Sequence, residues 1–362
     1  MQIIKLHEDC QIVVGAKRAL IIDFGRNKYF AIPLGLSLIL QKYQGKQLSN
    51  LVKDFDTDID TIEDYLDFLI NQELIFFCDT LEEYESFIPL SLQWDFPALI
   101  SNIIWDLPDI PFDYSDILNQ IELLGSQHIS FRLFKTYNIN QLNSLLGTLE
   151  DSSICSIEIA APFDTSYTDF EINSLCLNHP RLNRLILFDD YSIKLDEEIL
   201  LIENCIIIKS KKHINSSISC GIVHRSYFAI NIPHFTEAQH HNTCLNRKIS
   251  IDAEGNIKNC PSMAKSYGNI KDTKLIDVVN NPDFQKVWHI KKDEITKCKD
   301  CEFRHICTDC RAYIENPEDQ YSAPLKCGYN PYTCEWEEWS TNPLKQKAIE
   351  YYGMQELIKS VK

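Results

Sequence analysis

Short apolar runs and helical periodicities divide the chain into regions of different character. In residues 1–79, the runs QIVVG, ALIIDFG and KYFAIP are broken by turn-forming residues and predict three strands. Three helical patterns follow, and the third repeats apolar side chains every three to four residues, as one buried helix face requires. These patterns predict a small α+β domain, followed by an acidic, proline-containing linker at 80–97.

The central region alternates between strand-like and helix-like patterns. Runs such as ALISNIIW, HISFRLF and CSIEIAAPF each precede an amphipathic helical pattern. Alternation of this kind is typical of βαβ units, so we predict an α/β fold with a parallel sheet or partial barrel over residues 98–235. Beyond residue 240 the periodicity gives way to short turns and cysteines, which predicts a cysteine-rich domain at 236–340 and a C-terminal helix or tail at 341–362.

Composition narrows the classes of function. The 362 residues include 35 Lys and Arg against 52 Asp and Glu, a formal charge of −17. Because nucleic acids and membrane surfaces are polyanionic, this balance argues against both as partners. No apolar run approaches the length of a membrane span, and the N-terminus has no secretory pattern, so we expect a soluble cytoplasmic protein. The oligomeric state is left open.

The distribution of cysteine indicates metal chemistry. Of the 14 cysteines, six are scattered in apolar contexts typical of small buried side chains, and eight lie between residues 244 and 334. Cys244 and Cys260 flank a hairpin pattern with Gly255 at its turn, and two C-x2-C pairs follow at 298–310. Two-residue spacing allows two thiolates to bind one metal centre from a tight turn. In a reducing compartment, this density predicts one or two metal centres rather than disulfides.

The order of these motifs resembles a SPASM domain, the auxiliary iron–sulfur module of many radical-SAM enzymes that modify peptides. One departure is that two residues, not three, precede the last cysteine of the central motif. The resemblance implies two auxiliary clusters, expected to be [4Fe-4S], with interlaced ligands. It places Cys244, Cys260 and Cys310 on the first cluster, and on the second Cys298, Cys301, Cys307 and Cys327.

The fourth ligand of the first cluster is not fixed by the resemblance. In the family it lies a few residues before the hairpin, where this chain reads PHFTEAQHHNT and has no cysteine. An open iron position is one alternative, and the candidate residues are Cys334, His240, His241 and Cys220.

The central region resembles a radical-SAM barrel without its catalytic centre. That family binds its catalytic cluster through C-x3-C-x2-C after the first barrel strand, but here ALISNIIWD is followed by LPDIPFDY. The spacing occurs nowhere in the chain, so no S-adenosylmethionine binding is expected and no catalytic residue is assigned.

Three strands followed by three helices make the N-terminal region similar to the winged-helix precursor-recognition domains of peptide-modification systems. The resemblance implies that a leader peptide binds as an added strand. An exposed strand edge also offers unpaired N–H and C=O groups, so Phe30→Pro is expected to remove one edge N–H. The residues expected to form this edge are Lys28, Tyr29, Phe30, Ala31 and Ile32.

As a whole, the chain resembles the peptide maturases of grasp-with-spasm systems, which implies a ribosomal precursor peptide and an ATP-grasp ligase as partners. The leading hypothesis is a maturation protein that binds the precursor and carries iron–sulfur clusters without radical-SAM chemistry. Two alternatives are a zinc-binding structural adaptor of the same fold and an independent enzyme that uses an open iron site.

Overall fold

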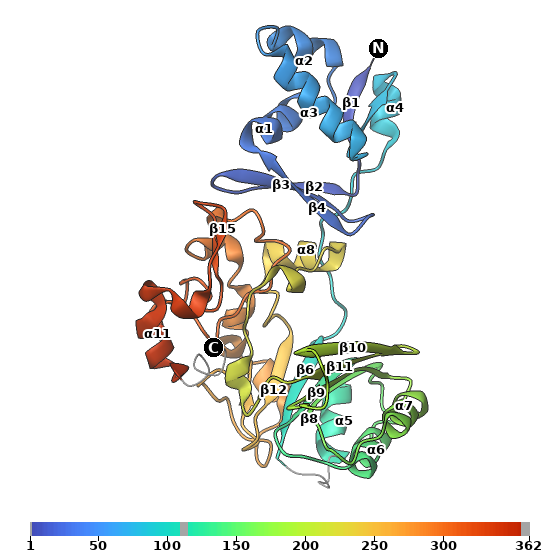
Figure 1. The fold of residues 1–362 in the computed structure, drawn as a ribbon, viewed down its shortest axis with the longest axis vertical. Helices are drawn as coiled ribbons and strands as arrows, with labels where there is room; N and C mark the ends of the chain where they lie inside the picture. Colours follow the sequence, from blue (N-terminus) through green and yellow to red (C-terminus); the bar gives the residue numbers. More distant parts are fainter. Residues whose placement is uncertain (1, 109–114, 356–362) are drawn as a thin grey trace.

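A computed structural model describes residues 2–108 and 115–355. The N-terminal unit forms one end of the molecule and the central sheet with its helices forms the other (Figure 1). The C-terminal region, yellow to red in Figure 1, lies between and beside them. No helix among the described residues is both long and apolar enough to cross a membrane.

The N-terminal unit contains the three predicted strands and the three predicted helices. Two further strands were not predicted, because each has only four residues and no clear alternation. A short helix, capped by Thr80, also lies within the expected linker. The elements are β1 (Ile3–Leu6), β2 (Cys10–Val14), β3 (Arg18–Asp23), β4 (Lys28–Pro33), α1 (Leu34–Tyr43), α2 (Leu48–Asp54), α3 (Ile59–Asn71), β5 (Ile75–Cys78) and α4 (Leu81–Ser86).

The sheet β2-β3-β4 separates two apolar cores. Because side chains alternate across a strand, Ala19 and Ile21 of β3 pack against helices α1 to α3, whereas Leu20 and Ile22 pack against the C-terminal region. Both faces of this small sheet are therefore covered. One edge of β4 has no neighbouring strand among the described residues.

The register of this sheet identifies which backbone groups face the free edge of β4. The N–H of Gly15 donates to the carbonyl of Arg18, so alternate residues of β3 bond toward β2. The intervening residues of β3 bond toward β4, where Ile21 is paired with Phe30. The expectation for Phe30 is therefore wrong, because its N–H faces β3, and the outward-facing groups belong to Tyr29 and Ala31.

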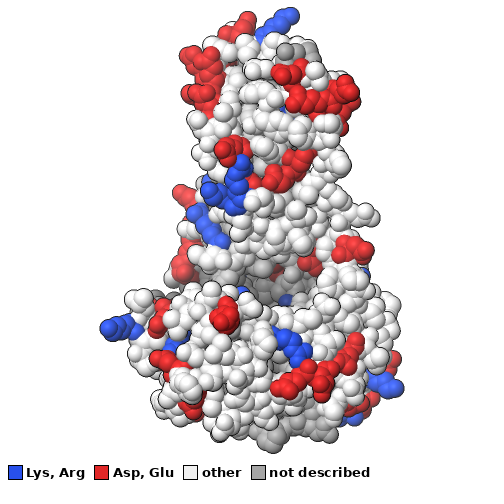
Figure 2. All heavy atoms as spheres, turned by 90° about the vertical axis from the view of Figure 1, so that its right-hand side faces the viewer, with Lys and Arg blue, Asp and Glu red and all other residues white. Residues whose placement is uncertain are grey.

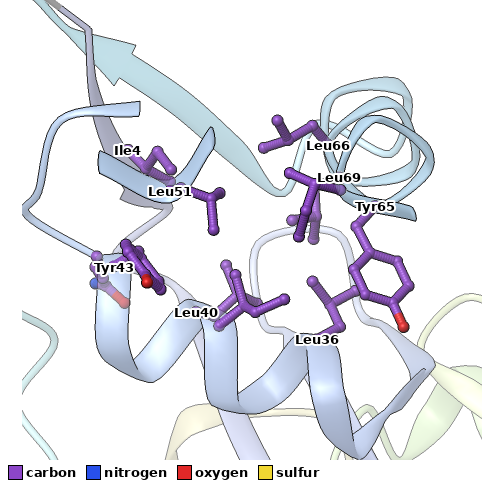
Figure 3. A pocket seen from close by; sticks show the side chains of 11 residues that line it. Ile4, Leu36, Leu40, Tyr43, Leu51, Tyr65, Leu66 and Leu69 are labelled. Carbon is purple, nitrogen blue, oxygen red and sulfur yellow. The ribbon is translucent and has the colours of Figure 1, made fainter. Parts of the chain in front are cut away.

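A small apolar cavity lies between α1, α2 and α3 (Figure 3). Its volume is about 10 Å³, at the lower limit for a single water, and its lining includes Leu40, Leu51 and Leu69. Such a lining offers a water few hydrogen bonds. This space is therefore a packing gap of the helical core and not a ligand site.

The central region forms a mixed α/β unit around an eight-stranded, mostly parallel sheet of order β10-β11-β9-β8-β7-β6-β12-β13. This confirms the predicted α/β class and its mostly parallel sheet. The strands are β6 (Asn102–Leu107), β7 (His128–Leu133), β8 (Ser156–Pro162), β9 (Leu182–Phe188), β10 (Glu197–Ile202), β11 (Cys205–Ser210), β12 (Lys248–Ile251) and β13 (Ile257–Lys258).

Helices cover one face of this sheet. Trp105, Phe131 and Ile159 point to that face and pack with α5 (Ser115–Leu123), α6 (Ile139–Gly147) and α7 (Asp169–Asn178). Capping boxes fix the starts of α6 and α7. The opposite face is polar, and on it Arg132 forms a bidentate pair with Asp106 at 2.6 and 2.7 Å.

The predicted hairpin of the cysteine-rich region is β12–β13, with Gly255 at φ +83° in its turn. Its first strand pairs in parallel with β6, so the regions predicted at 98–235 and 236–340 share one sheet. The predicted insert after the hairpin divides into two helices, because Asn281 caps a new helix that begins at Pro282.

The remaining elements are short and lie mainly in the C-terminal region. Part of the expected tail, residues 356–362, lies outside the described residues. The elements are η1 (Ser217–Ser219), η2 (Arg225–Tyr227), α8 (Ile232–His240), α9 (Leu275–Val279), α10 (Pro282–Gln285), η3 (Lys286–His289), η4 (Lys292–Glu294), η5 (Cys298–Asp300), β14 (Tyr329–Asn330), β15 (Glu335–Trp336), η6 (Trp339–Thr341), η7 (Pro343–Lys345) and α11 (Gln346–Tyr351).

Candidate metal centres

The second cysteine set converges on one cavity. Cys298 lies in turn η5 and Cys301 directly follows it. Cys307 lies after the next turn, and Cys327 lies on a loop distant in sequence. All four line the same cavity, together with Lys292. The structure thus brings together the four residues that the SPASM resemblance places on the second cluster.

The first set has four members rather than three. Cys244 precedes β12, Cys260 follows β13, and each lies close enough to Cys310 for a charge on one thiol to affect the others. Cys220 interacts in the same way with all three. The structure therefore brings Cys220, alone among the four proposed residues, to the first set.

Gly221 explains how Cys220 reaches this position. A Cβ atom at Gly221 would lie 2.8 Å from Sγ of Cys310, and its φ is +86°. Both observations require glycine beside the thiol. The adjacent Cys-Gly pair is the sequence signal that could have favoured Cys220, although it lies well before the segment in which the ligand was expected.

The other candidates for a fourth ligand lie elsewhere. His240 is exposed at the end of α8, and the ring of His241 packs against Trp94, at a centroid distance of 4.7 Å. Cys334 lies beside Tyr329 and Arg18, near the N-terminal unit.

Burial opposes ionisation of Cys298 and Cys260, one thiol of each set, in the protein alone. Burial, together with the charges of neighbouring cysteines, raises the pKa of Cys298 to about 12 and that of Cys260 to about 11. Metals bind the thiolate, so a positively charged centre would offset the cost of gathering four negative charges. The donor chemistry of both sets fits a thiolate-bound metal or cluster.

The sulfurs of the described cysteines do not form a group as compact as a single bound zinc ion requires. Tetrahedral zinc with bonds of about 2.3 Å holds its sulfurs roughly 3.8 Å apart. Among the described residues, no three of these cysteines have sulfurs within 4.8 Å of one another. In a four-iron cluster each thiolate binds a different iron, which keeps the sulfurs farther apart.

A buried polar group separates the two sets. Asp309 is 1% exposed, accepts a 2.6 Å hydrogen bond from Asn242, and pairs with Arg311 at 2.7 Å. Its charge acts on cysteines of both sets, including Cys244 and Cys298. The second C-x2-C pair is therefore split across Asp309, with one cysteine in each set.

The N-terminal unit rests directly on the second set. The N–H of Ala16 donates to the carbonyl of Asp300 at 2.8 Å, and Arg304 donates to the carbonyl of Val14 at 2.7 Å. Arg18 pairs at 2.6 Å with Glu302, whose side chain is fully buried. The β2–β3 hairpin is thus joined to the loop that carries Cys298 and Cys301.

An aromatic layer continues this contact. Tyr29 on β4 packs edge-on against Phe303 at a centroid distance of 5.6 Å, and also contacts Phe228. Phe228 and Phe303 line the cavity of the second set. The strand expected to bind a peptide therefore touches the wall of this cavity.

The first set lies beside the polar face of the large sheet. Charges on Cys220 and Cys260 act on Arg132, which pairs with Asp106 there. Burial raises the pKa of Asp106, although Arg132 opposes this rise. Figure 2 shows a hollow at the middle of the molecule, between the N-terminal end and the sheet end.

Comparison with known proteins gives a family match within the cysteine-rich region. Residues 243–302 match the SPASM family of iron–sulfur cluster-binding domains. The match includes cysteines of both sets and supports the SPASM resemblance. No curated protein matches the chain.

Two solved structures with similarity to the chain are of SuiB from Streptococcus suis. One is bound to S-adenosylmethionine, with 12% identity, a TM-score of 0.33, and coverage of 89% of this chain and 99% of SuiB. The other is bound to the precursor peptide SuiA, with 11% identity, a TM-score of 0.32, and coverage of 89% and 98%. At these TM-scores the similarity supports no closer comparison.

Proposed function

We propose that the protein binds two [4Fe-4S] clusters and a ribosomal precursor peptide. The observation that carries the proposal is the convergence of eight cysteines into two sets of four, one of which supports the N-terminal sheet. The first cluster would be held by Cys220, Cys244, Cys260 and Cys310, and the second by Cys298, Cys301, Cys307 and Cys327.

Clusters at these sites would cross-link distant segments and supply one-electron redox chemistry. The chain's own residues bind them, exclude water and hold the N-terminal unit against the second set. With four thiols in each set, an open iron position is not favoured. We propose no radical-SAM chemistry, because the chain has no C-x3-C-x2-C motif. Most of the segment where that motif would occur, residues 109–114, lies outside the described residues.

The proposed peptide site is the free edge of β4, on a winged-helix unit of residues 1–79. Tyr29 and Ala31 direct backbone groups to this edge, and Ala31 is exposed. Phe30 packs toward α3 through Phe68, at a centroid distance of 6.3 Å. An extended peptide added here would bond to β4 and lie next to α3, as in strand addition.

The charge of α3, which contacts β4 through Phe68 and Phe30, supports one class of peptide. The exposed side chains of α3 include Asp60, Glu63, Asp64 and Asp67. Acidic side chains also gather over the N-terminal unit in Figure 2. We therefore propose that the leader carries Lys or Arg beside its strand-forming segment.

The ligase is the remaining component of the proposal. The chain has no glycine-rich phosphate loop, so an ATP-grasp partner of the grasp-with-spasm type would supply the ATP-dependent bond formation. We also propose that the predicted regions 1–79, 80–97, 98–235, 236–340 and 341–362 differ in function. Strand β12 of the region 236–340 pairs with β6 of the region 98–235, so these two regions share a sheet.

Anaerobic purification with iron, sulfide and zinc counts tests the cluster assignment. We expect about eight irons per chain and broad absorption near 400 nm. A colourless protein with about two zinc ions would instead support the structural adaptor.

Peptide binding is tested separately. Synthetic peptides that correspond to short reading frames beside the gene are titrated into the iron-loaded protein. Saturable binding of a basic peptide supports the proposal. Failure of every such peptide to bind would remove the precursor-binding half and leave the metal assignment intact.

A further inference from the structure

Lys292 is a buried lysine directed at a cysteine of the second set. It is 5% exposed, and its Nζ atom lies 2.9 Å from Sγ of Cys307 and 2.7 Å from the carbonyl oxygen of Thr308. Lysine is almost never this buried without a charged partner. Among the ion pairs of the described residues, none joins Lys292 to a carboxylate. The sulfur of Cys307 is therefore its closest partner of opposite charge once ionised.

The first set provides a contrast. Lys248 also lies near a ligand cysteine, but its Nζ atom is 3.8 Å from Sγ of Cys244 and the residue is only partly buried. Other lysines also lie near the sets. Nζ of Lys326 donates to the carbonyl of Cys220 at 2.8 Å, and Lys297 lines the cavity of the second set. Lys292 and Lys248 are distinguished by contacts with ligand sulfurs, at different distances. The shorter contact is the more deeply buried one, where charge interactions are screened least.

We infer that Lys292 is a positioning residue that raises the reduction potential of the cluster at the second set. This inference rests on the proposed cluster assignment. The potential of an iron–sulfur cluster depends on its net charge and on hydrogen bonds to its sulfurs. An ammonium group 2.9 Å from a ligand sulfur supplies both effects and favours the more negatively charged oxidation state. Lys248 has a weaker effect on the first cluster because its contact is longer.

The test is a redox titration of the anaerobically purified full chain, followed by EPR. The potentials are compared among wild type, Lys292→Met, Lys292→Arg and the matched control Lys248→Met. We expect Lys292→Met to shift one transition to lower potential and leave the other in place. Lys292→Arg keeps the positive charge, so its potential should lie close to that of the wild type. Lys248→Met should produce a smaller shift, in the other transition.

A second measurement uses the wild-type protein, in case Lys292→Met fails to retain its cluster. Pulsed EPR of reduced protein labelled with ¹⁵N-lysine should detect a nitrogen coupling to one cluster, and the coupling should persist in Lys248→Met. Unmoved potentials in an iron-loaded Lys292→Met protein, or no ¹⁵N coupling in wild type, would overturn the inference. Wild-type protein without iron would overturn the cluster assignment itself, and this inference with it.

Discussion

The two cysteine sets differ in what they hold together. The first set gathers cysteines from before and after the β12–β13 hairpin and lies beside the polar face of the large sheet. The second is built mainly from one short loop, on which the β2–β3 hairpin of the N-terminal unit rests. The first is therefore coupled to the central sheet and the second to the proposed peptide site. Loss of one set should affect a different part of the molecule than loss of the other.

The largest expected effect is the loss of iron when one ligand of either set is replaced. Cys301→Ser and Cys244→Ser should each lose about four of about eight irons, because each removes one ligand of one cluster. In Cys301→Ser alone, the β2–β3 hairpin should become sensitive to protease, since the loop beneath it is no longer cross-linked. Unchanged iron in either variant would remove that cysteine from its set.

The next largest effect on iron content concerns the fourth ligand of the first set. Cys220→Ser should lose the first cluster, whereas the matched variant Cys334→Ser should keep its full iron content, because Cys334 lies beside Tyr329. Iron counts and EPR signals distinguish the two. The reverse pattern would place Cys334, and not Cys220, at the first cluster.

The peptide site should respond to an edge substitution without loss of iron. Ala31→Pro removes one outward N–H and is expected to weaken precursor binding about tenfold, equivalent to roughly 1.4 kcal/mol, by calorimetric titration. Phe30→Pro serves as the contrast, because it breaks the β3–β4 ladder and should lower stability as well. Full affinity in a folded Ala31→Pro protein would contradict strand addition at β4.

The contact between the N-terminal unit and the second set should depend on Arg18. Arg18→Met leaves the buried carboxylate of Glu302 without its ion pair, at a cost of about 2 kcal/mol after allowance for the partial exposure of Arg18. Hydrogen exchange should rise in β2 and β3 and stay constant in β6 to β9. Equal exchange in both sheets would show that the contact does not stabilise the hairpin.

The smallest expected effect concerns the acid sensitivity that His241, packed against Trp94, gives the protein. Burial, and then the charges of His289, His240 and Arg247, lower the pKa of His241 to about 4 from 6.5. The unfolded chain therefore takes up a proton as the pH falls below 6.5, while the native protein does not. Stability should decline by about 1 kcal/mol between pH 6.5 and 5, discounted for partial exposure. Denaturation curves of His241→Gln should show a shallower decline.

The sequence by itself determined the chemistry of the cysteine-rich region and most of the local structure. The SPASM resemblance placed Cys298, Cys301, Cys307 and Cys327 on one centre, and the two-residue spacing of Cys298 and Cys301 allows both to bind it from one turn. Alternating patterns likewise predicted the parallel strands, since each pattern depends on which face of an element is buried.

Tertiary structure decided the remaining features, because they depend on contacts between distant segments. Cys220 joins the first set only because the chain returns to Cys310 beside Gly221. Which backbone groups of β4 point outward depends on the β2–β3 register, because that register decides which residues of β3 bond to β4. The parallel pairing of β12 with β6, and the approach of Lys292 to Cys307, likewise bring together residues that no local pattern connects.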